Sequence, residues 1–395
     1  MEITLLPGKL SGAVTVPPSK SMAHRMLICA SFSRHPMQLV CPEIGADIAA
    51  TVACLNALGA DIHPNDTGFA IAPITNYRQK AALPCGESGS TLRFLLPIVG
   101  ALGIDAVFEM EGRLPHRPLS PLWEEMERMG CTLTRPTDRT IQCTGKLRPG
   151  HYRMDGSVSS QFISGLMMAL PLIDGETSLE ITGNVESKPY IEMTRYVLDL
   201  FKDGCPERIE VEGDWSSAAF WLAANAMGSK IQVLSLKESS PQGDSAITAL
   251  LPLLDENITV SAGDIPDLVP VLAVVAAARK GAVFTDIRRL RLKESDRVAS
   301  VMAMLESLGG KAEATENTLT VYGTGLIGGT VDSFGDHRIA MAAAMAATVC
   351  NEPVTILNAE CVRKSYPDFW EDYNRLASPP YGNGGSLWHH PLAKI

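Results

Sequence analysis

Apolar and polar positions alternate along this chain in a pattern that repeats. At six places a short stretch of small and polar residues opens directly into an apolar helical run. The intervals between these openings are roughly 50 to 70 residues, longer than the common solenoid repeats, which indicates one supersecondary unit used six times. The six openings are Pro18–Ser21, Glu87–Ser90, Gly156–Gln161, Gly213–Ser217, Asp264–Asp267 and Gly335–Arg338.

Each unit is predicted to run strand, helix, strand, helix and then one or two strands. In the first unit the predicted elements are strand Ala13–Val16, helix Ser19–Ser31, strand Met37–Cys41, helix Asp47–Leu58 and strands Ala60–Ile62 and Gly68–Ile71. The second helices end at a shared glycine, which a left-handed turn at a helix C-terminus requires. These glycines are Gly59, Gly130 and Gly309. Two units are shorter, because only one strand is predicted between the second helix and the next opening: Arg208–Val211 in one unit and Ile258–Val260 in the other.

Length and composition narrow the class of protein. A chain of 395 residues favours two or three domains, and 46% hydrophobic with 20% charged residues is typical of a compact folded protein. The net charge of −10 argues against a general nucleic-acid or anionic-membrane binder, because those need a basic face. Any anion site must therefore be a local cluster of lysine and arginine.

The sequence also indicates the compartment. The N-terminus lacks the basic and apolar regions of a signal peptide, and the longest apolar runs, such as Leu268–Ala278, are shorter than a membrane span. The nine cysteines form no CxxC pair, which argues against a disulfide framework or a zinc site. We expect a cytoplasmic protein with a flexible tail at 378–395, in which His389 and His390 are incidental rather than metal ligands.

Basic residues gather near the helix openings. A helix start has free backbone N–H groups and a partial positive charge, so it suits phosphate or carboxylate. Any one basic residue could be an ordinary surface charge, but repeated placement near helix starts favours anion binding. The residues concerned are Lys20, Arg25, Arg93, Arg117, Lys293, Arg297, Arg338 and Lys364.

Serines and carboxylates add candidate chemistry. The stretch Gly156–Gln161 holds three serines, where one would suffice to cap a helix, and consecutive hydroxyls suit a phosphate. Ser187 offers another hydroxyl near a helix start. Asp267 and Glu294 are either structural, as a helix cap and an ion-pair partner, or groups positioned for proton transfer. No HExxH, GxSxG, Walker A or dinucleotide motif is present.

Seven short sequence motifs, several of them described above, occur in this chain. In type and order they resemble the motifs of the 3-phosphoshikimate 1-carboxyvinyltransferase family, also called EPSP synthase, and the resemblance extends from about residue 2 to residue 377. The motifs are Ser19–Ser21 with Arg25, Gly156–Phe162, Ser187–Tyr190, Ile265–Asp267, Lys293–Arg297, Asp336–Arg338 and Lys364–Asp368.

The resemblance implies an α/β fold of two similar lobes, each with three repeated βαβαββ units about a pseudo-threefold axis, an inside-out α/β barrel. It places one lobe at 1–19 plus 213–377 and the other at 20–212, with the active site in the cleft between them. The implied reaction moves the enolpyruvyl group of phosphoenolpyruvate to the 5-hydroxyl of shikimate 3-phosphate and releases phosphate. No cofactor and no metal are implied, and a monomer is expected.

Residue roles follow from the same resemblance. Asp267 is the expected base toward the 5-hydroxyl, Glu294 the acid that protonates the methylene carbon, and Lys20 lies between the two ligands. The residues expected to bind shikimate 3-phosphate are Lys20, Ser21, Arg25, Ser159, Ser160, Gln161, Ser187, Asp267 and Lys293. Those expected to bind phosphoenolpyruvate are Lys20, Gly89, Arg117, Gln161, Arg297, Arg338 and Lys364.

Two positions depart from the family pattern, and two other functions stay open. Glu87 stands where many relatives have asparagine, and Phe94 where proline is frequent. The UDP-N-acetylglucosamine enolpyruvyl transferase shares the fold, but it carries a reactive cysteine in the loop that corresponds to 113–118, and this chain has none there. A non-catalytic protein that binds phosphorylated metabolites is the other alternative, against which the presence of both Asp267 and Glu294 argues.

Overall fold

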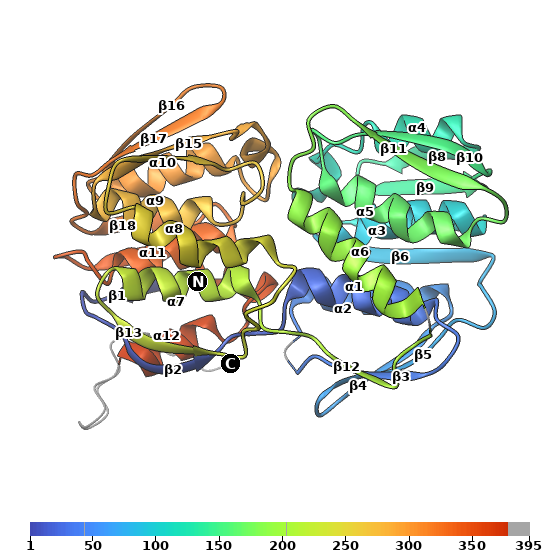
Figure 1. The fold of residues 1–395 in the computed structure, drawn as a ribbon, viewed down its shortest axis with the longest axis horizontal. Helices are drawn as coiled ribbons and strands as arrows, with labels where there is room; N and C mark the ends of the chain where they lie inside the picture. The colour runs from blue at the N-terminus through green and yellow to red at the C-terminus, as the bar shows by residue number, and fades with distance from the viewer. Residues whose placement is uncertain (43, 203, 378–395) are drawn as a thin grey trace. The chain divides into compact units, whose positions relative to one another are not determined.

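The computed structural model describes residues 1–42, 44–202 and 204–377, so the predicted flexible tail with His389 and His390 lies outside the described residues. The chain divides into two compact units (Figure 1). The discontinuous unit combines Met1–Pro17 with Gly213–Ile395, and the continuous unit is Pro18–Glu212. Each unit has its own hydrophobic core.

The described residues of the continuous unit form three sheets. Its strands are β3 (Met37–Val40), β4 (Asp61–Asn65), β5 (Gly68–Ala72), β6 (Lys80–Gly86), β7 (Asp105–Met110), β8 (Cys131–Thr137), β9 (Thr140–Gly145), β10 (Gly150–Asp155), β11 (Thr177–Thr182) and β12 (Arg208–Glu210). The sheet orders are β12-β3-β5-β4, β6-β7-β9-β8 and β10-β11. Its helices are α1 (Lys20–Ser31), α2 (Ala46–Leu58), α3 (Gly89–Leu102), α4 (Leu122–Arg128), α5 (Ser160–Ala169) and α6 (Lys188–Lys202).

Up to residue 377, where the description ends, the discontinuous unit also forms three sheets. Its strands are β1 (Glu2–Leu5), β2 (Ser11–Thr15), β13 (Lys230–Leu234), β14 (Ile258–Ser261), β15 (Gly281–Thr285), β16 (Lys311–Ala314), β17 (Thr318–Tyr322), β18 (Gly329–Asp332) and β19 (Val354–Leu357). The sheet orders are β1-β19-β18, β13-β2 and β14-β15-β17-β16. Its helices are α7 (Trp215–Ala226), α8 (Ile247–Leu253), α9 (Val269–Ala278), α10 (Arg297–Ser307), α11 (His337–Ala346) and α12 (Phe369–Ala377).

The helices that follow the polar openings form the cores. In α9 every residue from Val269 to Ala277 is buried, and α11 is buried along its whole length. A helix that is apolar on all sides must be enclosed by other elements, which explains why α9 and α11 pack against each other inside their unit. The polar residues that precede such helices are thereby brought to the ends of buried helices.

The predicted repeat is confirmed, with one correction. The runs β6-α3-β7-α4-β8-β9 and β14-α9-β15-α10-β16-β17 both follow the βαβαββ pattern, and Gly59, Gly130 and Gly309 have φ of 116°, 118° and 81°. However, the strand predicted to begin the first repeat belongs to the other unit, where β2 pairs in parallel with β13.

Strand β12, from the end of the continuous unit, takes the vacant place beside β3. The Pro17-Pro18 pair explains the change of unit, because proline has no N–H to donate to a strand ladder. Beyond this pair the Ser19 N–H donates to the Glu212 carbonyl at 2.8 Å, which joins the start of α1 to the chain that leaves β12. Within the described residues, no helix combines the length and the apolar character needed to cross a membrane.

Candidate active site

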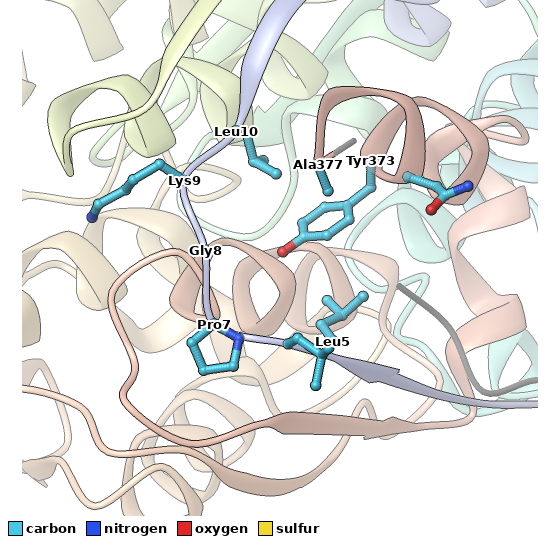
Figure 2. A pocket seen from close by; sticks show the side chains of 9 residues that line it. Leu5, Pro7, Gly8, Lys9, Leu10, Tyr373 and Ala377 are labelled. Atoms are coloured by element: carbon cyan, nitrogen blue, oxygen red, sulfur yellow. The ribbon is translucent and has the colours of Figure 1, made fainter. Parts of the chain in front are cut away.

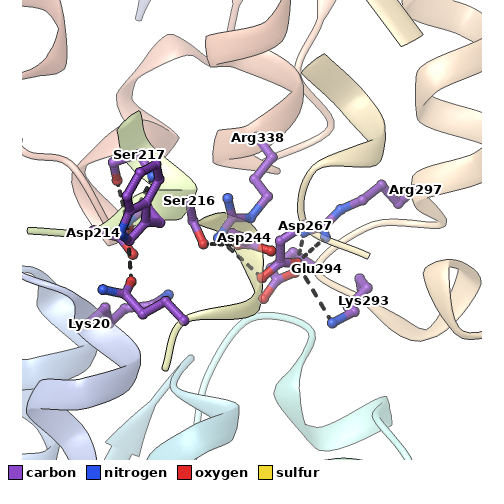
Figure 3. Close-up of polar contacts among 12 residues, drawn as sticks. Lys20, Asp214, Ser216, Ser217, Asp244, Asp267, Lys293, Glu294, Arg297 and Arg338 are labelled. Carbon is purple, nitrogen blue, oxygen red and sulfur yellow. Dashed lines mark hydrogen bonds and ion pairs between the residues drawn. The ribbon is translucent and has the colours of Figure 1, made fainter. Parts of the chain in front are cut away.

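Five of the predicted site residues meet in one ion-pair cluster of the discontinuous unit (Figure 3). They come from the starts of three helices that pack together: Asp267 precedes α9, Arg297 begins α10, and Arg338 is the second residue of α11. The helix starts are fixed locally, because the Asp296 carboxylate accepts from the Ala299 N–H at 3.1 Å and Asp336 from the Arg338 N–H at 3.0 Å.

Arg297 is the centre of this cluster. Its side chain is 1% exposed, and its guanidinium donates to Asp267 at 2.7 Å, to Glu294 at 2.8 Å and to Asp336 at 3.0 Å. Burial alone would lower the pKa of Arg297, but the three carboxylates outweigh burial and raise this pKa above its ordinary value. Arg297 therefore holds two candidate catalytic carboxylates in fixed positions.

Asp267 lies among three cations. Besides Arg297, it binds Arg338 at 3.1 Å and Lys293 at 3.7 Å. Burial raises the pKa of Asp267, but these cations outweigh burial and hold the pKa well below 3.8. Asp267 does not cap α9, whose N-cap is Leu268, so the helix-cap alternative is wrong for this residue.

The two lysines of the discontinuous unit's candidate site differ in their surroundings. Burial lowers the pKa of Lys293 to about 8, with Asp267 acting in the opposite direction. Lys364 ends a short 3₁₀ helix, Ala359–Lys364, and its ammonium donates to the Gly335 carbonyl at 3.4 Å. This contact brings Lys364 to the loop that leads into Asp336 and Arg338.

In the continuous unit Lys20 pairs with a residue that the sequence did not single out. The Lys20 ammonium lies 3.0 Å from Asp47, at the first turn of α2. Beneath them, the Thr51 hydroxyl is 2.7 Å from His24 Nδ1 and 2.6 Å from the Thr91 hydroxyl. Burial lowers the pKa of His24 to about 3, so the ring is neutral and serves the hydrogen-bond network.

Arg25 is a buried cation with neutral partners. Its guanidinium donates to the Thr194 hydroxyl at 2.7 Å, the Ser21 carbonyl at 2.7 Å and the Tyr190 carbonyl at 3.0 Å, and it lies 4.9 Å from the Phe94 ring centroid. Burial lowers the pKa of Arg25 to about 10, and no carboxylate among the described residues pairs with it. A bound anion would compensate this buried charge.

Gln161 is fixed at both ends of its amide. Arg93 donates to its oxygen at 2.9 Å, and its nitrogen donates to the Ser90 hydroxyl at 2.9 Å. The sequence placed Arg93 near a helix start but did not foresee that it would orient Gln161. Gly89, the first residue of α3, lies against two guanidiniums: a Cβ there would be 2.6 Å from Arg93 Nη1 and 2.8 Å from Arg117 Nη1.

The serines of the predicted phosphate site lie at the starts of helices α5 and α6. Ser159 caps α5 by accepting from the Gln161 N–H at 3.3 Å, so the capping alternative holds for that residue. Ser160 is the first residue of the helix and is buried, so helix capping does not account for a serine at this position. The loop before Ser187 joins this stretch, because the Glu186 N–H donates to the Gly156 carbonyl at 3.3 Å. Ser187 is buried with φ of 57°, a strained value for a residue with a side chain.

Two further carboxylates near the cluster carried no strong signal in the sequence. In the sequence Asp336 stands out only as part of the string Asp336–Arg338, and no motif contains Asp244. Asp244 is 3% exposed, and the Ser216 hydroxyl donates to it. Burial, followed by the negative charge of Asp267, raises the pKa of Asp244 to about 7.

A cavity elsewhere in the discontinuous unit does not have this chemistry. It has a volume of about 160 Å³ and lies between the chain that joins β1 to β2 and helix α12 (Figure 2). Its walls are mostly apolar, and its one amine, Lys9, donates to the Met227 carbonyl at 2.6 Å. None of the predicted site residues lines it.

Comparisons with known proteins connect the whole chain to one family. A family model described as EPSP synthase (3-phosphoshikimate 1-carboxyvinyltransferase) matches residues 6–373. A relative named 3-phosphoshikimate 1-carboxyvinyltransferase from Clostridium kluyveri is 37% identical over 412 residues, covering 95% of this chain and 97% of the relative. The relative of the same name from Clostridium acetobutylicum is 36% identical over 414 residues, with the same coverage.

Solved structures agree at the level of the fold. EPSP synthase from Acinetobacter baumannii matches with a TM-score of 0.77 at 24% identity, covering 95% of this chain and 98% of that one. The enolpyruvyl transferase NikO from Streptomyces tendae matches with a TM-score of 0.69 at 20% identity, covering 95% and 97%.

Proposed function

The chain belongs to the EPSP synthase family, and on this basis we propose that it transfers the enolpyruvyl group of phosphoenolpyruvate to the 5-hydroxyl of shikimate 3-phosphate. The observation that carries the proposal is the Asp267–Arg297–Glu294 arrangement. Asp267 and Glu294, which we propose as the proton acceptor and the proton donor, both contact one buried guanidinium, at 2.7 Å and 2.8 Å.

The reaction needs two proton movements in its first half. As the 5-hydroxyl oxygen bonds to C2 of phosphoenolpyruvate, its proton passes to Asp267, and Glu294 protonates the methylene carbon C3. In the second half the C2–O bond breaks, phosphate leaves with the electron pair, and C3 returns a proton to the Glu294 carboxylate, which restores the vinyl group. Asp267 is suited to the first step because its low pKa keeps it ionised and able to accept a proton.

The other predicted residues would bind the ligands. Both substrates carry phosphate and carboxylate groups, so fixed cations must offset their mutual repulsion, and guanidinium groups bind such anions bidentately. We propose Ser159, Ser160 and Ser187 for the phosphate of shikimate 3-phosphate and Arg25 for its carboxylate. The remaining proposed contacts are Lys20, Ser21, Gln161 and Lys293 for shikimate 3-phosphate, and Lys20, Gly89, Arg117, Gln161, Arg297, Arg338 and Lys364 for phosphoenolpyruvate.

One assay tests this function against its alternatives. Phosphate release from phosphoenolpyruvate should depend strictly on shikimate 3-phosphate, with unphosphorylated shikimate a far poorer acceptor. Release that depends instead on UDP-N-acetylglucosamine would favour the related transferase, and binding of both ligands without turnover would favour a non-catalytic binding protein. The variant Glu294→Gln should lose most of its activity, whereas Glu313→Gln on strand β16 should keep full activity, because Glu313 is exposed and its partners in the described part of the chain are Lys311 and Tyr322.

We also propose a cytoplasmic monomer. All nine cysteines are free thiols, of which seven are buried and two, Cys29 and Cys205, are partly buried, as expected in a reducing compartment. Mass photometry of the purified protein checks the oligomeric state.

A further inference from the structure

Asp244 is a buried carboxyl group that the reaction described above does not use. It lies in the short 3₁₀ helix Gly243–Ala246, which leads into α8. The Ser216 hydroxyl of α7 donates to Oδ2, while Oδ1 is buried and has no hydrogen-bond partner within the described part of the chain. A carboxylate buried with so few donors is costly in its charged form, so the position favours the protonated form.

Three charged groups act on Asp244 from the elements packed around it. They are Asp214 at the start of α7, Asp267 before α9 and Arg338 in α11. Figure 3 shows Asp244 between Ser216 and the pair of Asp267 and Arg338. Burial and the charge of Asp267 raise the pKa of Asp244 to about 7, although Arg338 and the Ser216 hydroxyl act in the opposite direction. Near neutral pH one member of this carboxyl pair is ionised and the other exchanges a proton.

We propose that Asp244 is a positioning residue that acts through Asp267, because its ionisation sets how strongly Asp267 can accept the proton of the substrate hydroxyl. The need arises from the surroundings of Asp267. Arg297, Arg338 and Lys293 make its carboxylate a weak base. A second negative charge on Asp244 offsets part of that positive field and raises the proton affinity of Asp267.

This inference rests on the proposed function, since it assumes that Asp267 accepts a proton during turnover. Asp244 need not touch a substrate. As pH rises through about 7, Asp244 loses its proton, Asp267 becomes a stronger base, and kcat should increase. The substrates' own phosphates also titrate and affect how kcat depends on pH. The contribution of Asp244 is therefore measured as the difference in the kcat profile between the native protein and a variant that cannot ionise at this position.

The variant Asp244→Asn provides that comparison, since asparagine has nearly the same shape and no charge. At about pH 6 its kcat should equal that of the native protein, and at about pH 8.5 it should be roughly threefold to tenfold lower, as expected for a pKa change of up to one unit at the base. A loss of kcat that is the same at every pH would assign Asp244 a purely structural role and overturn the inference.

Two further variants sharpen the test. Ser216→Ala removes a donor that favours the ionised form, so the midpoint of the kcat profile should move to higher pH, whereas an unchanged midpoint would count against the inference. Asp255→Asn is a matched control in the exposed turn after α8, where Asp255 pairs with Arg279 at 2.9 Å, and its profile should match the native one.

A measurement without substrates separates this inference from the proposed function. Infrared difference spectroscopy of the native protein should show a carboxyl group that loses its proton near pH 7, and the signal should be missing in Asp244→Asn. If the native protein shows no turnover with shikimate 3-phosphate, the proposed function fails. If it turns over but the two spectra are identical, the inference about Asp244 fails.

Discussion

Replacement of Gly89 by alanine tests how closely the candidate phosphoenolpyruvate site is packed. A Cβ on Gly89 would lie 2.6 Å from Arg93 Nη1, 2.8 Å from Arg117 Nη1 and 3.2 Å from Arg117 Cζ. Both guanidiniums must therefore move. Arg93 is not free to do so without cost, because it donates to the Gln161 oxygen at 2.9 Å and to the Pro118 carbonyl at 3.2 Å.

The size of the effect follows from these contacts. Restoring ordinary van der Waals separation requires shifts of roughly 0.5 to 1 Å, enough to weaken one charge-assisted hydrogen bond worth roughly 1.5 to 3 kcal/mol. At 1.4 kcal/mol for each factor of ten, the KM for phosphoenolpyruvate should rise roughly tenfold to a hundredfold. The loss of stability should be smaller than the value of that hydrogen bond, because Gly89 lies in helix α3 and alanine favours a helix over glycine by roughly 0.5 to 1 kcal/mol.

Steady-state kinetics with each substrate varied in turn measures this change. The KM for shikimate 3-phosphate should change far less than that for phosphoenolpyruvate. Glyphosate is an inhibitor that the family resemblance places at the phosphoenolpyruvate site. It should compete with phosphoenolpyruvate in the native protein and bind Gly89→Ala less well, because it is slightly longer than phosphoenolpyruvate. Gly8→Ala is the control, since a Cβ at Gly8 would meet nothing within 4 Å. An unchanged KM for phosphoenolpyruvate in Gly89→Ala would refute the assignment of Gly89 and Arg117 to that site.

Three other predictions concern the carboxylates and serines. Glu294→Gln should lower kcat by ~10²- to 10⁴-fold with little change in substrate binding, and near-normal turnover would contradict its role as the acid. Alanine at Ser159, Ser160 and Ser187 together should weaken shikimate 3-phosphate far more than shikimate in calorimetry, whereas equal losses would exclude a phosphate site. Since the folded pKa of Asp244 is raised from 3.8 to about 7, its stabilising effect is complete below pH 3.8 and lost as pH rises to 7. From acidic pH to pH above 7, the free energy of unfolding of the native protein should therefore fall by roughly 2 to 4 kcal/mol more than that of Asp244→Asn. Parallel pH profiles of the two proteins from urea unfolding would contradict the shifted pKa.

The repeat could be predicted from the sequence because its signals are local. Helix openings, apolar runs and glycines such as Gly59 and Gly130 depend on a few neighbouring residues, and the structure places them as expected. Strand pairing is different, because β2 and β12 are both short and either could lie beside β3. The change of unit at Pro17 decides between them. The family resemblance places residues 1–19 with 213–377, but the local pattern of strand and helix signals does not show it.

The roles of single carboxylates were harder to predict for the same reason. Asp47 and Asp244 stand in ordinary sequence surroundings, and their importance comes from what folding brings to them. Asp47 gains the Lys20 ammonium at 3.0 Å, and Asp244 gains burial next to Asp267. A lysine or arginine near a helix start is visible in the sequence, but the acid that will neutralise it can lie anywhere along the chain.

That neutralisation reconciles the acidic chain with an anion-binding site. In the discontinuous unit, three cations (Lys293, Arg297 and Arg338) pair with three carboxyl groups (Asp267, Glu294 and Asp336), which offset much of the positive charge without a ligand. The three cationic side chains differ in exposure. Arg297 is 1% exposed, whereas Arg338 is 7% and Lys293 is 21% exposed, so Arg338 and Lys293 are more accessible to a ligand. An incoming anion would compete with Asp267 for Arg338 and Lys293, and as it draws these cations away, Asp267 would become a stronger base. Substrate binding itself would then prepare Asp267 for the proton transfer, while Arg297 keeps it in place.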